Sequence, residues 1–339
     1  MLRSLAKLAV RLDIDYAANG LVENFYSNAL GARPRLARRF QVLAYHKVSP
    51  DPHPFFEPVH PEIFEQHVQF LSRCYRVMPL SELVERNRTG DIPIRAVAIT
   101  FDDGYRDNYD YALPILKKYQ LPATIFVSTG VIDTGEILWH DRVFDAFRFS
   151  TVPRARLQHA GIPELKLESL EDRRRSLSPV LIRAKQLYGE ARLRFVEEIE
   201  NALRPCQDES VRNRMLTWEQ IREMHSAGIE FGSHTVSHPI LSRIPRDELV
   251  KELRESRREL CDRLGTPISL FAYPNGHASD YNNEVKAVIR DSGYLCAVTS
   301  RAGFNHVFSD PFEIRRGQPW HKQIELFRFA LFLERHGFN

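Results

Sequence analysis

Short runs of apolar and β-branched residues alternate with longer stretches of helical periodicity from residue 40 onward. This alternation is typical of an α/β fold with a mainly parallel sheet. The predicted strands span residues 40–45, 96–101, 123–128, 229–233, 269–273 and 295–299. The predicted helices span residues 61–73, 105–119, 218–227, 246–264, 282–292 and 321–336.

The regular alternation breaks between residues 139 and 215, where Arg, Leu and Glu are frequent. We therefore expect a mostly helical insertion at about 140–215 within a main domain that spans residues 40–325. An amphipathic segment is expected over residues 1–39 and a C-terminal helix over residues 326–339. After the insertion, Thr217 and Gln220 have the spacing of a capping box at the start of a helix.

The composition is that of a soluble globular protein, with 43% hydrophobic and 27% charged residues among 339. A formal net charge of +3 is too small for the broad basic surface of a nucleic-acid-binding protein. The four cysteines form no C-x-x-C pair, so they predict neither a cysteine zinc site nor a disulfide framework. No apolar stretch is long enough to cross a bilayer.

The first 40 residues carry seven basic and three acidic side chains, with leucines at roughly helical spacing. Charged residues interrupt the apolar run, so the segment does not read as a secretory signal. We expect a cytoplasmic protein whose N-terminus is compatible with peripheral contact to an anionic membrane. The same stripe is also typical of a helix that packs on its own domain.

An apolar strand over residues 96–101 leads directly into Asp102, Asp103 and Gly104. The carboxyl ends of parallel strands are where α/β folds place their ligands. Adjacent strand residues point to opposite faces, so we expect different roles for the two aspartates. The same tripeptide also occurs in turns that only end a strand, so it does not identify a site alone.

A second polar segment, His-Thr-Val-Ser-His, follows another predicted strand and places His234 and His238 four residues apart. In a helical turn the two imidazoles would face the same way and could bind one ion. Histidine pairs at this spacing also occur without a metal. A carboxylate from the first segment would complete a ligand set that leaves positions open for water and a substrate carbonyl.

Together, residues 100–104 and 234–238 resemble the first and second motifs of the polysaccharide deacetylase family, also called the NodB-homology family or carbohydrate esterase family 4. The resemblance covers roughly residues 40–320. It implies a distorted (β/α) barrel of about seven parallel strands, with the helical insertion added. It also implies that Asp103, His234 and His238 bind a divalent metal and that Asp102 is the general base.

The resemblance implies removal of N-acetyl groups from a polysaccharide, an oligosaccharide or a lipid-linked glycan precursor, in the synthesis of cell-surface polysaccharide. A divalent metal would polarise the amide carbonyl and lower the pKa of its bound water. Asp102 would accept the proton of that water, and a backbone N–H would help the metal to stabilise the oxyanion. Zinc is the expected metal, with cobalt, nickel, manganese and iron as alternatives.

The third family motif usually reads Arg-x-Pro-Tyr-Gly, whereas residues 271–276 read Phe-Ala-Tyr-Pro-Asn-Gly. Ala272 therefore stands where the family has the arginine that orients the base. A related branch with Phe-Ala-Tyr-Pro in this motif also resembles the chain around Arg316. We therefore expect Arg316 to orient Asp102.

The general acid that would protonate the leaving amine is not marked, because no Leu-x-His motif follows the last predicted strand. His46, His306 and His321 are the candidates. His46 ends the first predicted strand and should reach the same rim as both motifs, so we expect it to be a catalytic residue, while the identity of the acid stays open among the three. The alternative is a buried core histidine.

Four further residues are expected to contact the substrate. They are Tyr105 after the first motif, Tyr273 and Pro274 in the third, and Trp139 at the mouth of the insertion. His140, the neighbour of Trp139, is a further candidate to line the sugar groove. An aromatic ring suits a sugar face, although an isolated Trp more often serves packing.

Other functions stay open at the level of sequence. Hydrolysis of another small or cyclic amide is one, because relatives of this fold with the Phe-Ala-Tyr-Pro motif are not all active on sugars. A catalytically inactive carbohydrate-binding relative is another, although retention of Asp102 weighs against it. A two-histidine-one-carboxylate iron oxygenase is disfavoured by the alternation of strands and helices. No Gly-x-Ser-x-Gly elbow or phosphate-binding loop is present.

Overall fold

The computed structural model describes residues 39–157, 161–162, 164–206, 214–319 and 321–336. Within these ranges the main sheet has eight strands. Its order is β10 (Asn305–His306), β1 (Arg39–Tyr45), β3 (Ala96–Phe101), β4 (Thr124–Val127), β7 (Glu230–Ser233), β8 (Leu270–Ala272) and β9 (Cys296–Val298), with β2 (Arg76–Val77) beside the start of β3. Only β10 pairs antiparallel among these described strands. The predicted α/β fold with a distorted, mostly parallel barrel is confirmed.

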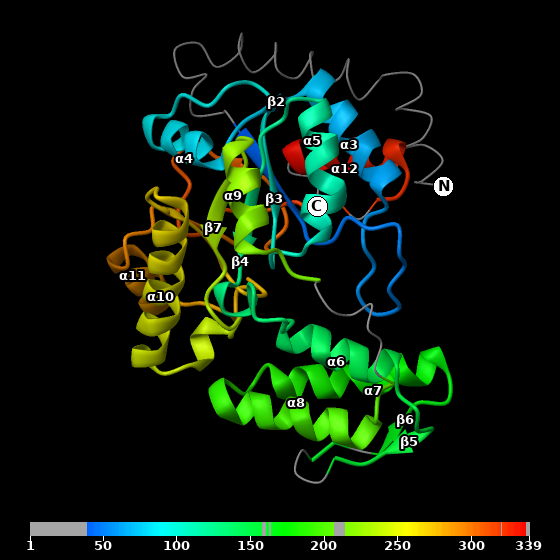
Figure 1. Ribbon diagram of the computed structural model, residues 1–339. Coiled ribbons are helices and arrows are strands. Elements are labelled where there is room, and N and C mark those ends of the chain that lie inside the picture. Colours follow the sequence, from blue (N-terminus) through cyan, green and yellow to red (C-terminus); the bar gives the residue numbers. More distant parts are fainter. Residues whose placement is uncertain (1–38, 158–160, 163, 207–213, 320, 337–339) are drawn as a thin grey trace.

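Helices pack on the outer face of the curled sheet (Figure 1). They are α3 (Pro61–Cys74), α5 (Leu113–Lys118), α9 (Trp218–Ser226), α10 (Arg246–Leu264), α11 (Asn283–Asp291) and α12 (Ile324–His336). Helix α4 (Leu80–Thr89) packs instead on the apolar core inside the barrel, through Leu80, Leu83 and Val84. Helix α4 and strand β2 were not predicted. The capping box before α9 is present, because the side chains of Thr217 and Gln220 each bond to the other's backbone N–H, at 3.2 and 3.0 Å.

Residues 314–317 close the gap between the two ends of the curled sheet. Ile314 forms a parallel bridge with Val298 of β9, and Gly317 forms one with Leu43 of β1. Backbone hydrogen bonds of 2.7 and 2.9 Å tie Gly317 to β1. A short irregular segment thus completes the barrel, and its backbone bonds to β1 and β9 fix its position.

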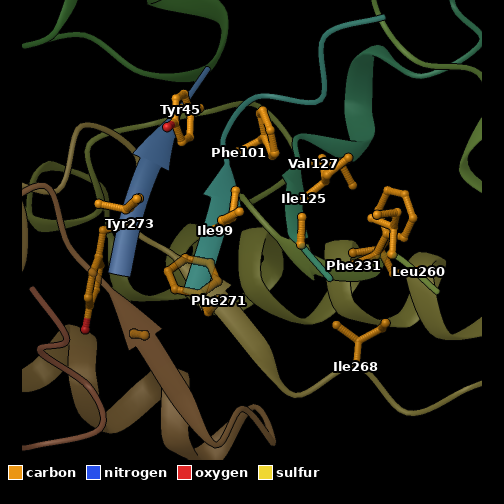
Figure 2. Packing of buried hydrophobic residues seen from close by; sticks show 14 of the residues in the cluster. Tyr45, Ile99, Phe101, Ile125, Val127, Phe231, Leu260, Ile268, Phe271 and Tyr273 are labelled. Carbon is orange, nitrogen blue, oxygen red and sulfur yellow. The ribbon is translucent and has the colours of Figure 1, made fainter. Parts of the chain in front are cut away.

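Strand side chains alternate between two apolar cores, as the two-residue period of a strand requires. On the outer face Ile99, Ile125 and Phe271 belong to the large core that also includes the helices (Figure 2). On the inner face Ala98 and Phe126 help to fill the barrel. Full burial of one large apolar side chain contributes about 1.5–3 kcal/mol, so these two layers hold the strand ends in fixed positions.

The insertion forms its own helical unit at one end of the molecule (Figure 1). Its described elements are α6 (Trp139–Arg148), α7 (Leu170–Ala184), α8 (Gly189–Leu203) and a two-stranded sheet of β5 (Arg154–Ala155) and β6 (Leu165–Lys166). Val143, Phe147, Val180 and Ile199 are buried in a core of its own. Its position next to the barrel allows it to form one side of a cleft.

The amphipathic segment expected over residues 1–39 lies outside the described residues, apart from Arg39. Among the helices that the structure describes, none is both long and apolar enough to cross a bilayer.

Gly232 in β7 is required by the close approach of β4. A Cβ atom at this position would lie 2.5 Å from two ring carbons of Phe126 and 2.9 Å from the carbonyl oxygen of Leu270. We expect Gly232→Ala to lower the free energy of unfolding by about 3 kcal/mol, at the upper end of the cost of overpacking a core. Chemical denaturation measures the change.

Gly265→Ala is the control for this variant. Gly265 has φ of +65°, but no atom lies within 4 Å of the position that a Cβ atom would take there. Its replacement should cost only about 1 kcal/mol through backbone strain. If both variants lost the same free energy of unfolding, the contact with Phe126 would not be the reason that position 232 requires glycine.

Candidate active site

Asp102 follows β3 at the carboxyl-end rim of the barrel and is 2% exposed. Its two carboxylate oxygens accept hydrogen bonds of 2.7 and 2.6 Å from Nη1 and Nη2 of Arg316. Nε of Arg316 donates to the carbonyl oxygen of Thr299 at 2.8 Å. Burial alone would raise the pKa of Asp102, but the charge and hydrogen bonds of Arg316 outweigh it and lower the pKa to about 2. Asp102 is therefore ionised at neutral pH.

Asp103, His234 and His238 converge beside this pair. Oδ1 of Asp103 lies 3.5 Å from Nε2 of His234 and 3.4 Å from Nε2 of His238. All three residues are buried, and one ligand atom from each lies within 4.8 Å of the others. Nδ1 of His234 lies 2.8 Å from the carbonyl oxygen of Ala272. That bond places the proton on Nδ1 and leaves the lone pair of Nε2 directed at Asp103.

The chemistry of these three residues fits a divalent cation. Oδ1 of Asp103 is buried without a hydrogen-bond partner among the described residues. Burial raises the pKa of Asp103 well above its usual value, and the charges of Asp102 and Asp141 raise it further. Burial likewise lowers the pKa of His234 and His238, which leaves both imidazoles neutral. Neutral imidazoles and a carboxylate without a compensating charge form a donor set suited to a divalent metal.

The segment that carries both histidines is a loop, which corrects the helical turn expected from the sequence. Thr235 and His238 have φ of 70° and 56°, in the left-handed region. The backbone N–H groups of Val236 and Ser237 both donate to Oε2 of Glu252 on α10, at 2.8 and 2.9 Å. Helix α10 thus holds the loop in a conformation that its local sequence does not favour.

The insertion holds the same loop from the other side. Nε1 of Trp139 donates to the carbonyl oxygen of His238 at 3.0 Å. Arg192, which is 3% exposed, donates to that oxygen at 3.2 Å and to the carbonyl oxygen of Ser237 at 2.7 Å. The Arg192 guanidinium also lies over the Trp139 ring, 5.1 Å from its centroid. These contacts connect the helical unit directly to a metal-ligand candidate.

His46 follows β1 and reaches the same rim. Its Nε2 lies 3.8 Å from Oδ2 of Asp102, and its ring packs edge-on against Phe56. Burial lowers the pKa of His46 to about 4, against the raising effect of Asp102. The other two acid candidates lie elsewhere: His306 is exposed on β10, and His321 lines a separate pocket.

A buried polar network extends from the site towards the insertion. Lys47 and Tyr105 donate to the two carboxylate oxygens of Asp141, each at 2.9 Å. The Tyr105 hydroxyl also lies 3.1 Å from Nε2 of His140, which in turn lies 3.9 Å from Oδ2 of Asp103. Burial alone would raise the pKa of Asp141, but the charge of Lys47 helps to lower it. This network fixes the ring of His140 beside the candidate metal ligands.

A cleft of about 170 Å³ opens onto the site between the barrel and the insertion. The barrel and its loops contribute His46, Phe56, Asp102, Asp103, His234, His238, Asn275 and Ser300, and the insertion contributes Trp139, His140, Phe144, Leu181 and Lys185. Nδ2 of Asn275 is buried without a hydrogen-bond partner among the described residues.

Three residues expected to contact substrate do not line this cleft. Tyr273 lies on the outer face of the barrel with Phe271 (Figure 2) and donates its hydroxyl to the carbonyl oxygen of Phe312 at 2.9 Å. The two-residue period of the strand turns it away from the site. Pro274 is buried and does not line the cleft, and the hydroxyl of Tyr105 bonds within the polar network. Of the four, only Trp139 lines the cleft, and its neighbour His140 lines it too.

Comparison with known proteins settles the family. The family model described as polysaccharide deacetylase matches residues 89–297. This chain belongs to the polysaccharide deacetylase family.

Two curated relatives carry the names of deacetylases. A putative polysaccharide deacetylase, YxkH of Bacillus subtilis, is 23% identical over 209 residues, which cover 62% of this chain and 46% of the relative. A poly-beta-1,6-N-acetyl-D-glucosamine N-deacetylase of Staphylococcus aureus is 39% identical over 79 residues, covering 23% of this chain and 27% of the relative. The aligned region therefore spans less than half the length of either relative.

Two solved structures share the fold. The deacetylase PplD of Streptococcus pyogenes, in complex with acetate, matches with a TM-score of 0.57 and 21% identity over 83% of this chain and 92% of its own. IcaB from Ammonifex degensii matches with a TM-score of 0.57 and 20% identity over 86% of this chain and 97% of its own. At 21% and 20% sequence identity, these two matches show a shared fold and nothing further.

Several residues of the site were not found from the sequence. Asp141 and Lys47 directly follow His140 and His46, so adjacency to candidate residues could have suggested them. Glu252 and Arg192 lie on helices whose charged residues look like ordinary solvated faces. Nothing in the local sequence distinguishes them, because their partners are backbone groups far away along the chain.

The buried pair of Asp102 and Arg316 should also matter for stability. Removal of one partner leaves an uncompensated charge in the barrel, so we expect Arg316→Met to lower the free energy of unfolding by about 3–5 kcal/mol. The double variant Asp102→Asn with Arg316→Met should be more stable than Arg316→Met alone, because neither side chain is then an unpaired ion. A double-mutant cycle in chemical denaturation measures both effects.

Arg315→Met is the matched control, because Arg315 is adjacent in sequence and only half-buried. It should change stability by no more than about 0.5 kcal/mol. If the changes in the free energy of unfolding of the two single variants added up to the change in the double variant, Asp102 and Arg316 would be energetically uncoupled.

Proposed function

We propose that this protein is a metal-dependent hydrolase that removes N-acetyl groups from a carbohydrate. The observation that carries the proposal is the placement of two adjacent aspartates in different environments at one rim. Asp102 is ionised and held by Arg316, whereas Asp103 is directed at two neutral imidazoles. A base and a ligand set thus open onto one cleft.

Asp103, His234 and His238 would hold the metal, which when bound polarises the amide carbonyl and acidifies a water molecule. Asp102 would accept the proton of the water that attacks the carbonyl carbon. Its low pKa keeps it ready to do so at neutral pH. The two oxygens of Asp102 are fixed by Arg316, so the base cannot rotate away from the attacking water. Zinc is the metal that this donor set favours.

His46 would return a proton to the departing amine nitrogen. Because burial lowers its pKa to about 4, the ring is neutral at pH 7 and must first gain a proton during the reaction. Asp102, which has just accepted one, lies 3.8 Å away. Passage of that proton from Asp102 to His46 and on to the amine balances the reaction, which releases acetate and a free amino sugar.

The substrate class follows from the family and from the cleft. The staphylococcal relative is named for deacetylation of an N-acetyl-D-glucosamine polymer. In this chain the buried amide of Asn275 offers a donor with no other partner among the described residues, and Phe56 and Phe144 offer apolar surface at the cleft. An N-acetylated glycan, as polysaccharide, oligosaccharide or lipid-linked precursor, supplies the carbonyl oxygen, hydroxyl groups and sugar faces that match these groups.

The assignment of the two aspartates can be tested with metal analysis and acetate release from N-acetylglucosamine oligosaccharides. We expect Asp102→Asn to retain the metal and to lose at least about 10²-fold in kcat, because it lacks only the general base. Asp103→Asn should lose the metal and the activity together. Asp110→Asn, at an exposed carboxylate that pairs with Arg106, is the control and should behave as the unmodified protein.

A metal-loaded protein that releases no acetate from any N-acetylated sugar would overturn the proposed function. Release of ammonia or ring opening from a small or cyclic amide by the same preparation would instead identify another hydrolase of this fold. Loss of metal from Asp102→Asn would show that the two aspartates have been assigned the wrong way round.

The role of His46 has a separate test. We expect His46→Gln to retain the metal and to lower kcat by about 10²-fold, since the amine would depart without a proton donor. Substrates with a better leaving group, such as an N-acetylated aryl amine, should be affected much less. His306→Gln is the matched control, because His306 is exposed on β10. Equal losses for good and poor leaving groups would exclude His46 as the acid.

A further inference from the structure

A second cleft of about 400 Å³ adjoins the catalytic one along helix α7 of the insertion. The two clefts share two lining residues, Leu181 and Lys185. The second cleft is otherwise lined by Pro54, Phe55, Arg174, Leu177, Ser178 and Ile182. A ligand long enough to extend past Leu181 therefore passes from one cleft into the other.

The charged groups of the second cleft are all basic. Among its lining residues Arg174 and Lys185 carry positive charge, and no lining residue is acidic. Nε and Nη2 of Arg174 donate to the carbonyl oxygen of Pro54, at 3.4 and 3.1 Å. Other N–H groups of the guanidinium are left for a ligand. The hydroxyl of Ser178 adds a neutral donor to this surface.

Lys185 lies at the point where the clefts meet. It is the C-cap residue of α7 and is half-buried. Its ammonium group makes no hydrogen bond or ion pair with the described residues, and burial lowers its pKa. The charge of Asp280 offsets only part of the effect of burial, and the charge of Arg243 adds to it. An anion from a ligand would reduce the remaining cost of burying the cation.

We propose that this second cleft is a subsite for an anionic group, a carboxylate or a phosphate, carried by the part of the substrate next to the N-acetylated sugar. Lys185 pairs with the anion, while Phe55 and Leu181 provide apolar surface for the adjoining ring or chain. Arg174, about three helical turns away along α7, adds positive charge at the far end of the cleft. The inference rests on the proposed function for the identity of the neighbouring sugar. It narrows the substrate to an acidic N-acetylated glycan or a phosphate-linked N-acetylated sugar.

The positive charge near the end of α7 also complements the helix dipole, and that structural role alone would give no preference among ligands. A measurement of ligand binding distinguishes this structural role from a role in binding an anion. The full-length, metal-loaded protein is titrated by calorimetry with two tetrasaccharides of equal length. One alternates N-acetylglucosamine with glucuronic acid, and the other contains N-acetylglucosamine only.

We expect the acidic tetrasaccharide to bind about tenfold more tightly than the neutral one at low salt, and the preference to shrink as salt is added. Lys185→Met keeps the aliphatic stem and removes the charge, so the ratio of the two dissociation constants should fall towards one. Lys166→Met, at an exposed lysine of β6 in the same insertion, is the matched control and should keep the ratio. The proposal is overturned if this ratio is the same in Lys185→Met and the unmodified protein and the phosphate ligand also shows no preference that depends on Lys185.

A parallel titration compares N-acetylglucosamine 1-phosphate with N-acetylglucosamine and distinguishes the two sources of the anion. A Lys185-dependent preference for the phosphate ligand but not for the uronate identifies a phosphate-linked sugar, and the reverse identifies an acidic glycan. No preference for either anion overturns the subsite.

Acetate release from the same ligands keeps this inference separate from the proposed function. Binding that depends on Lys185 without release of acetate would retain the subsite and reject the deacetylase. Release of acetate at equal kcat/KM from charged and neutral ligands would retain the deacetylase and reject the subsite.

Discussion

The buried ion pair between Arg316 and Asp102 depends on the way the barrel closes. The bridges that Ile314 and Gly317 form with β9 and β1 fix the backbone of residues 314–317. Arg316, the third residue of this closure, is fully buried and points into the barrel, where both ends of its guanidinium meet the carboxylate. An unpaired arginine there would be very costly, so closure of the barrel and ionisation of Asp102 stabilise each other.

The two aspartates show how one turn can give neighbouring carboxylates opposite properties. Asp102 faces a cation that the protein supplies, whereas Asp103 faces neutral imidazoles and has no such partner among the described residues. The pKa of Asp102 is therefore low and its carboxylate is ionised by a partner within the chain. The pKa of Asp103 is raised, so its carboxylate needs a positive charge from outside the chain to be ionised. The difference comes from position around one rim rather than from residue type.

The insertion is part of the site rather than an addition to its surface. Trp139 and Arg192 hold the carbonyl oxygens of the histidine loop, while Glu252 holds its N–H groups from the barrel side. A loop with two residues in the left-handed region is thereby kept in one conformation. The same helical unit supplies Lys185 and Leu181 to the wall of the cleft, so it both holds the histidine loop and shapes the cleft.

The sequence by itself determined the fold class, the positions of six strands and the two motifs. The strands follow from hydrophobic periodicity, and the motifs follow from the spacing of residues that are close together in the chain. It also suggested that Arg316 approaches Asp102, through resemblance to a family branch. Only the tertiary structure decided that Tyr273 faces the outer core, that the histidines lie on a loop, and that Arg192 and Glu252 hold that loop. Such contacts join residues far apart in the chain, and their partners are backbone groups that carry no signature in the sequence.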